Sequence, residues 1–226
     1  MKKSRLLVAA TLSATLAACA TSPTGRKQLM LVSEQQAISA SRQAYVQEMG
    51  KYRQAGKLVD DPKLLRRVEV ITGRLVAQAV KMRPDSARWD WSVAIIDDPK
   101  AVNAWCMAGG RMALYTGLLR QVDPTDDELA QVMAHEIAHA LANHSAERMS
   151  VAMASQAGYD PRAAATLWQK MGAVGGGKSP PAFLSTHPSD QQRQQRLGAL
   201  ASKMMPYYQA PGTRPTHPVR VGAGAA

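Results

Sequence analysis

Residues 125–149 constrain this chain most, because they predict one long helix with a buried face. Thr125 and Glu128 have the spacing of a capping box, in which each side chain accepts a hydrogen bond from the other residue's backbone N–H. Asp126 and Asp127 add negative charge in the first turn, where the helix dipole favours it. The apolar residues behind this cap recur at helical spacing and are Leu129, Val132, Met133, Ile137, Ala140 and Leu141.

The same helix carries the pattern His135-Glu136-x-x-His139. His139 lies about 40° around the helix from His135 and one turn further along, so both imidazoles can reach one metal ion. Glu136 projects about 80° from their mean direction and is placed to act as general base on a metal-held water. The alternative is a pair of exposed or hydrogen-bonded histidines, but this HExxH spacing on a capped helix is typical of metallopeptidases. His144 faces about 180° away from His135 and is not expected to be a ligand.

The first eighteen residues read as a secretory signal peptide. A basic start at residues 1–5 precedes an uncharged run at residues 6–18, which is shorter than the ~20 residues that a bilayer requires. The run ends in Leu16-Ala-Ala-Cys19, which resembles a bacterial lipobox with Cys19 as the lipidated residue. The alternative is an ordinary signal peptide. Ala20 resembles the residue found in lipoproteins sent to the outer membrane, so we expect a lipid-anchored protein facing the periplasm.

The composition fits a single basic domain. The formal net charge is +11, of which residues 1–18 contribute three positive charges. A net positive charge of this size favours binding to an anionic membrane or another anionic partner. Nucleic acid is not an expected partner, because an exported chain does not ordinarily meet it. Of the two cysteines, Cys106 has no intramolecular partner if Cys19 carries lipid, so no disulfide framework is expected. The expected divisions are the signal at 1–18, a metallopeptidase domain at 19–205 and a disordered tail at 206–226.

The remaining pattern predicts helices around a small sheet. Helices are expected from Ser33 to about residue 54, from Asp61-Pro62 to before Pro84, from Asp160-Pro161 to Met171, and from Ser189 to about Met205. Alternation from Trp89 to Ile95 predicts a strand, and Gly109-Gly110 between two apolar runs predicts a hairpin. The edge of this antiparallel sheet could bind an extended peptide by β-addition, or the sheet could serve only to pack against the helix.

Six stretches together carry the motifs of one peptidase family. They are Thr24–Ser33, Val102–Met107 with Gly109-Gly110, Tyr115–Leu119, His135–His144, Ala157–Pro161 and Ser185–Asp190. These stretches resemble the HtpX/CAAX-protease type of gluzincin metallopeptidase, in its secreted lipoprotein branch. The resemblance implies a mostly helical α+β fold of zincin type, with a small antiparallel sheet packed near the HExxH helix.

The resemblance also implies roles for individual residues. His135 and His139 would bind one Zn²⁺ per chain, Glu136 would be the catalytic base, and His187 would lie at the mouth of the site, able to contact the metal or a developing oxyanion. The substrate-pairing strand would consist of Asn103, Ala104, Trp105, Cys106 and Met107. The implied function is a membrane-anchored periplasmic zinc endopeptidase that cleaves proteins or peptides, in envelope protein quality control.

One departure from the family matters for activity. The family's third zinc ligand is a Glu in a Glu-Ala-Asp segment shortly before the Gly-Tyr-Asp-Pro motif, and this chain lacks that segment. Glu147 would lie roughly 12 Å beyond His139 along an unbroken helix and could not complete the site. A catalytic zinc normally has three protein ligands. The alternative function is therefore an inactive lipoprotein that binds unfolded or outer-membrane proteins.

Overall fold

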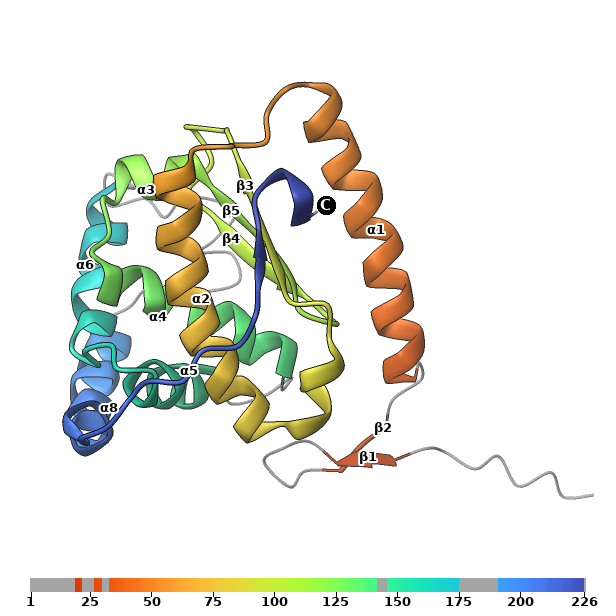
Figure 1. The fold of residues 1–226 in the computed structure, drawn as a ribbon. Coiled ribbons are helices and arrows are strands. Elements are labelled where there is room, and N and C mark those ends of the chain that lie inside the picture. The colour runs from red at the N-terminus through yellow and green to blue at the C-terminus, as the bar shows by residue number, and fades with distance from the viewer. Residues whose placement is uncertain (1–18, 22–26, 30–32, 142–145, 175–190, 226) are drawn as a thin grey trace, which may run out of the picture.

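The structure, a computed structural model, describes residues 19–21, 27–29, 33–141, 146–174 and 191–225 (Figure 1). The first helices are α1 (Glu34–Gln54) and α2 (Pro62–Met82), followed by the 3₁₀ turn η1 (Pro84–Arg88). The later helices are α3 (Thr116–Gln121), α4 (Asp126–Leu141), α5 (Ala146–Gln156), α6 (Ala163–Val174) and α8 (Gln191–Gln209). The strands are β1 (Cys19–Thr21), β2 (Lys27–Leu29), β3 (Ser92–Ile96), β4 (Ala104–Met107), β5 (Arg111–Tyr115) and β6 (Arg220–Val221), with a last turn η2 (Ala223–Ala225).

The main sheet has four strands in the order β4-β5-β3-β6. The hairpin of β4 and β5 is antiparallel, as predicted, and both turn glycines have positive φ, +88° at Gly109 and +85° at Gly110. However, β5 and β6 both run parallel to β3, so the sheet is mixed and the expected antiparallel sheet was wrong outside the hairpin. The hairpin places its second strand beside β3, which leaves β4 paired only with β5 among the described strands.

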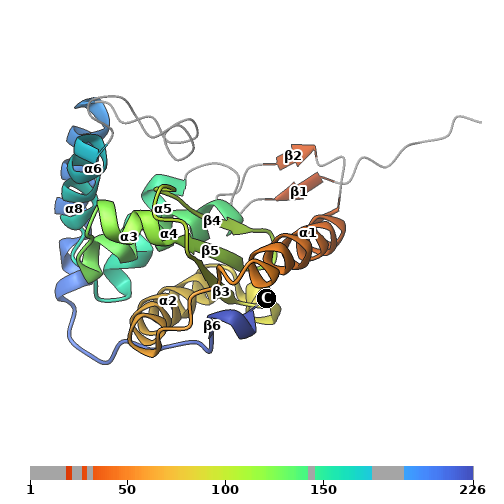
Figure 2. The same ribbon diagram turned by 90° about the horizontal axis from the view of Figure 1, so that it is seen from above.

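The sheet is buried on both faces, as Figure 2 shows, with α1 on one side and α2 and α4 on the other. All five residues of β3 are therefore buried, and their alternation sorts them between two cores. Val93 and Ile95 belong to the large core under α2 and α4. Ala94 and Ile96 belong to a smaller core under α1, which holds the sheet through Tyr45. The Tyr45 hydroxyl donates to the Met112 carbonyl at 3.1 Å.

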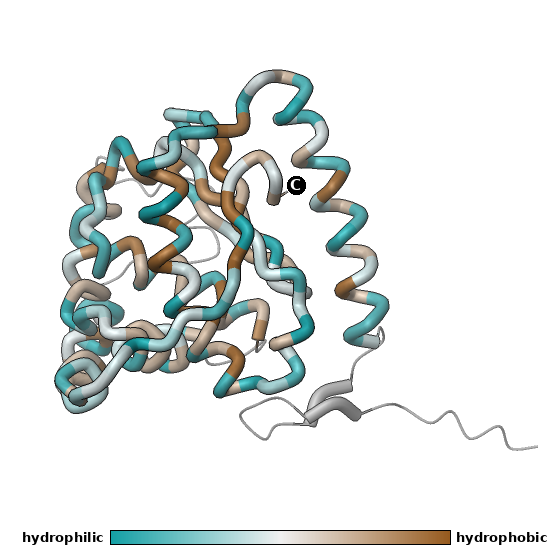
Figure 3. Tube along the Cα trace, in the orientation of Figure 1, coloured by the Kyte–Doolittle hydropathy of each residue, from teal (hydrophilic) through white to brown (hydrophobic). Residues whose placement is uncertain are grey.

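The helix starts follow the sequence closely. Ser33 and Gln36 form the predicted capping box of α1, and Asp61 caps α2 directly before Pro62. Figure 3 shows that α1 is largely hydrophilic along its length, which agrees with its position on the outside of the sheet. Among the described helices, none has the length and apolar composition needed to span a bilayer.

The helix predicted over residues 125–149 is in fact two helices. Its start is as predicted, because Glu128 N–H donates to the Thr125 hydroxyl and Thr125 N–H donates to the Glu128 carboxylate, at 3.2 and 2.9 Å. However, α4 ends at Leu141, and α5 begins at Ala146 and packs back against α4. The helical periodicity continues through both segments, so local pattern alone could not reveal the break.

The prediction of a disordered tail after residue 205 was also wrong. Helix α8 runs on to Gln209, and β6 pairs with β3 at the edge of the sheet. Between them the chain crosses α2 closely, with His217 N–H donating to the Gly73 carbonyl at 2.9 Å. A Cβ at Gly73 would lie 3.0 Å from the His217 carbonyl oxygen, so this close approach favours glycine. The tail is ordered by contacts with distant segments, which its own composition does not indicate.

A buried carboxylate at the start of α4 joins this helix to α6. Glu128 accepts hydrogen bonds from the Lys170 ammonium at 2.7 Å and from the Thr166 hydroxyl at 2.8 Å. Burial raises the pKa of Glu128, but the hydrogen bonds from Lys170, the Thr125 N–H and Thr166 together lower it by more. The net result is a pKa below its ordinary value of 4.5. The charged form of Glu128 is therefore the form that the fold stabilises.

This shift predicts how Glu128 contributes to stability with pH. Because the folded pKa is the lower one, the contribution is fully present above pH 4.5 and is lost as the pH falls through the folded value. We expect Glu128→Gln to lower the free energy of unfolding by roughly 2 kcal/mol at neutral pH, and this deficit to shrink in acid. Urea unfolding of both proteins across the pH range measures the deficit, and a deficit that grows in acid would contradict the assignment.

Candidate metal and catalytic site

The two histidines of the HExxH pattern converge on one point in the structure. The Nε2 atoms of His135 and His139 lie 3.1 Å apart, and the two rings are nearly perpendicular, with centroids 4.6 Å apart. Two nitrogens that each lie about 2.0–2.1 Å from one zinc ion are separated by roughly 3–3.5 Å. The pair therefore fits a shared metal ion. His135 is buried within the helix layer, whereas His139 is exposed at the edge of the site.

The surroundings of His139 and of Glu136 favour the uncharged forms of these two side chains. Desolvation of its ring, together with the positive charge of Arg193, lowers the pKa of His139, and a neutral imidazole is the form that binds metal. Burial raises the pKa of Glu136 to about 8. Such a carboxylate is a stronger base than an exposed one, as general base catalysis near neutral pH requires.

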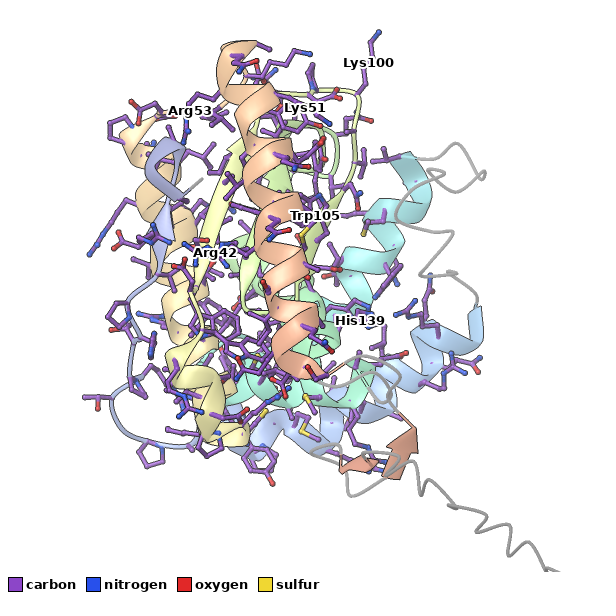
Figure 4. The ribbon with its side chains drawn as sticks, turned by 90° about the vertical axis from the view of Figure 1, so that its right-hand side faces the viewer. Arg42, Lys51, Arg53, Lys100, Trp105 and His139 are labelled. Carbon is purple, nitrogen blue, oxygen red and sulfur yellow. The ribbon has the colours of Figure 1, made fainter. Side chains whose placement is uncertain are left out.

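The candidate substrate strand lies beside this helix. β4 packs against α4, and burial together with the negative charge of Glu136 raises the pKa of Cys106 well above its usual range, which keeps the thiol protonated. Trp105 points to the opposite face, where its ring packs edge-on against Tyr45 at 5.8 Å. In Figure 4, Trp105 and His139 appear on the same side of the molecule, beside α1. The edge predicted from Asn103 to Met107 thus runs along the HExxH helix.

Arg193, which is buried, and Glu147 lie near His135. All three residues line one small cavity of about 20 Å³ between α4, α5, α6 and α8, which has room for about one water molecule. Glu147 reaches this cavity because the helix breaks before α5. Its carboxylate lies 3.6 Å from the Arg193 guanidinium, which stacks 3.9 Å above the Trp168 ring. The described residues contain no group of three His, Cys, Asp or Glu side chains close enough to hold a metal ion.

Sequence reasoning did not single out Arg193. The sequence nevertheless contains a pattern that could have indicated Arg193. Arg193, Leu197 and Ala201 are spaced four residues apart and form the buried stripe of α8. A cation at the first position of a buried stripe is unusual unless it has a partner. One partner of Arg193 is Glu147. The sequence predicted one continuous helix over residues 125–149, which would have placed Glu147 too far from the site.

Several predicted residues cannot be placed. His187, His144 and the signal peptide at 1–18 lie outside the described residues, and the backbone of Cys19 forms part of β1. The role of His187 and the lipidation of Cys19 stay predictions.

Comparison with known proteins identifies the family. The sequence profile described as Peptidase family M48 matches residues 62–156 and 145–201, which together are more than half of the chain. The chain belongs to peptidase family M48. The resemblance to HtpX-type metallopeptidases is thereby confirmed at the level of the family.

Curated relatives of this M48 protein include mitochondrial and bacterial enzymes. The mitochondrial metalloendopeptidase OMA1 of Arabidopsis thaliana is 29% identical, over 47% of this chain and 31% of the relative. OMA1 of Schizosaccharomyces pombe is 31% identical, over 47% of this chain and 45% of the relative. The beta-barrel assembly-enhancing protease of Yersinia pestis is 33% identical, over 46% of this chain and 20% of the relative. The chain thus spans less than half the length of each of these relatives.

The two matched stretches overlap in residues 145–156, which correspond to α5 apart from one end residue. This helix therefore lies in both matched stretches, and the Gly-Tyr-Asp-Pro motif at Gly158–Pro161 follows it in the second stretch.

Proposed function

We propose that this M48 protein is a zinc-dependent endopeptidase of the cell envelope. The observation that carries the proposal is the 3.1 Å approach of the His135 and His139 Nε2 atoms on a helix whose next carboxylate, Glu136, is buried beside them. Family membership makes the reaction class a metal-dependent hydrolysis of peptide bonds. Zinc is the metal that we infer, because paired imidazoles with this spacing are typical zinc ligands.

Each residue in the proposed site has a defined task. His135 and His139 hold the metal ion, which when bound polarises the scissile carbonyl and acidifies water. Glu136 accepts the proton of the attacking water and passes it to the leaving amine. The edge of β4, from Asn103 to Met107, holds the substrate backbone extended by strand pairing. By resemblance, His187 would lie at the mouth of the site, able to contact the metal or a developing oxyanion.

We further propose that the protein is lipidated at Cys19 and faces the periplasm from the outer membrane, where it degrades misfolded envelope proteins. Two observations support this location. Residues 1–19 have the charge, length and ending of a lipoprotein signal. Bacterial relatives, including one from Escherichia coli, bear the name beta-barrel assembly-enhancing protease.

A second candidate function rests on the metal-binding groups. Among the described side chains, no third His, Cys, Asp or Glu joins His135 and His139 as a ligand, and Glu147 is engaged with Arg193. A protein that bound zinc too weakly for catalysis could still hold unfolded chains along β4. This inactive envelope protein is the alternative that the experiment must exclude.

Dependence of proteolysis on zinc separates the two functions. The purified chain loaded with zinc is expected to hydrolyse unfolded casein, to lose this activity after dialysis against a chelator, and to regain it when zinc is restored. Binding of unfolded casein without hydrolysis, at any zinc concentration, would instead identify the inactive form. Calorimetric titration of zinc into the stripped protein provides a readout that does not depend on turnover.

A further inference from the structure

A groove lies between α5 and α8, next to the candidate metal site. These two helices pack against each other and are labelled in Figure 1. It has a volume of about 500 Å³, which is within the range of ligand-binding clefts. One stripe of α8 forms its wall, because the lining residues of this helix are spaced three or four apart. These are Arg196, Ala199, Leu200, Lys203 and Met204, and α5 contributes Glu147 and Arg148.

The groove combines an apolar floor with a cationic rim. Leu200 and Met204 are half-buried along the floor, whereas the three cations Arg148, Arg196 and Lys203 are exposed. Within the described part of the chain, these three side chains make no ion pair. Arg196 and Lys203 are seven residues apart on one helix face, or roughly 10 Å along its axis. Their positive charge is therefore available to a ligand that carries several negative charges.

The groove adjoins the candidate catalytic centre through one shared residue. Glu147 lines both the groove and the small cavity that contains His135. One turn before Arg196 on α8 lies Arg193, whose guanidinium is 3.6 Å from the Glu147 carboxylate. A ligand in the groove would therefore contact Glu147, which also lines the cavity beside His135.

From this arrangement we infer that the groove binds an acidic, amphipathic segment of the polypeptide substrate. Acidic side chains of the segment would pair with Arg148, Arg196 and Lys203, while its apolar side chains would cover Leu200 and Met204. A concave site with a narrow apolar floor and a connection to the metal site suits a peptide better than a flat membrane surface. The identification of this ligand as substrate rests on the proposed peptidase function, whereas its binding does not.

Binding of matched peptides to the Glu136→Gln protein tests the inference without cleavage. A fluorescein-labelled peptide of alternating Leu and Asp is compared with its isosteric Leu and Asn counterpart by fluorescence anisotropy. We expect tighter binding of the Asp peptide, weakened by salt. The triple substitution Arg148→Glu, Arg196→Glu and Lys203→Glu is expected to weaken this binding about tenfold or more, because three exposed ion pairs are replaced by repulsion. The alanine triple variant is expected to show a smaller loss.

A second charge-reversal triple controls for net charge. Lys57, Lys81 and Lys100 are exposed and line none of the cavities described above, so their reversal to Glu should leave binding of the Asp peptide nearly unchanged. Equal weakening by both triples, or equal binding of both peptides, would overturn the inference. Vesicles of anionic phospholipid that bind through the same three cations, when the peptide does not, would also overturn it and would assign the groove to lipid.

Turnover separates failure of the inference from failure of the proposed function. If the protein binds the Asp peptide selectively but hydrolyses no casein, the groove is a peptide-binding site and the proposed peptidase function is wrong. If the protein hydrolyses casein in a zinc-dependent way but does not prefer acidic segments, the peptidase function holds and the inference about the groove is wrong.

Discussion

Replacing Glu136 with Gln is expected to reduce the rate of zinc-dependent casein hydrolysis by roughly 10²–10⁴-fold. Gln has the size of Glu but cannot accept the proton of the attacking water, so the general base is lost while the fold is kept. Because Glu136 is placed beside the metal pair rather than in it, zinc content should stay at that of the wild type. Steady-state hydrolysis of casein by both zinc-loaded proteins measures the effect.

A matched control for this variant is Glu69→Gln on α2. Glu69 is exposed and forms an ion pair with Arg66 at 2.9 Å, so its loss should change neither activity nor stability appreciably. Unchanged casein cleavage in Glu136→Gln would contradict the assignment of the base, and with it the proposed mechanism.

His139→Ala is expected to lower the zinc affinity by more than about 100-fold, because a direct ligand contributes more than the outer groups that orient it. In equilibrium dialysis at a zinc concentration that saturates the wild-type site, the wild-type chain should bind about one zinc ion, and the variant close to none. Only His135 would then remain of the converging pair. Elemental analysis of zinc per chain measures the stoichiometry, and circular dichroism shows whether the helices persist.

Another histidine of the chain provides the control for His139→Ala. His217 lies on the segment that crosses α2, where its ring nitrogen Nδ1 is 3.0 Å from the Pro218 carbonyl oxygen. Zinc stoichiometry should not change in His217→Ala. If His139→Ala retained zinc at the wild-type level, the metal would have to bind elsewhere, and the convergence of the two rings would have no catalytic meaning.

Among the described side chains, the histidine pair has no third metal donor, which bears on the expected zinc affinity. The structure shows Glu147 close to Arg193 rather than joined to the histidine pair, and the described residues provide no other acidic group there. A wild-type zinc affinity much weaker than that of a site with three protein ligands would agree with this arrangement.

The sequence by itself determined the local features of this protein. Thr125 and Glu128 specify where α4 begins, Gly109 and Gly110 specify the hairpin, and the spacing of His135 and His139 specifies the convergence of their rings. Each depends on residues within a few positions of one another, so hydrogen bonding and backbone geometry settle it locally.

Only the tertiary structure decided the features that depend on distant partners. The mixed sheet depends on β5 and β6 both pairing with β3, and the tail is ordered by its contact with α2. The break after Leu141 lets α5 pack against α4, which brings Glu147 and Arg193 to the metal site. Composition and periodicity describe what a segment can form alone. They do not describe which surface will bury it, and burial against a distant surface is what stabilises these segments.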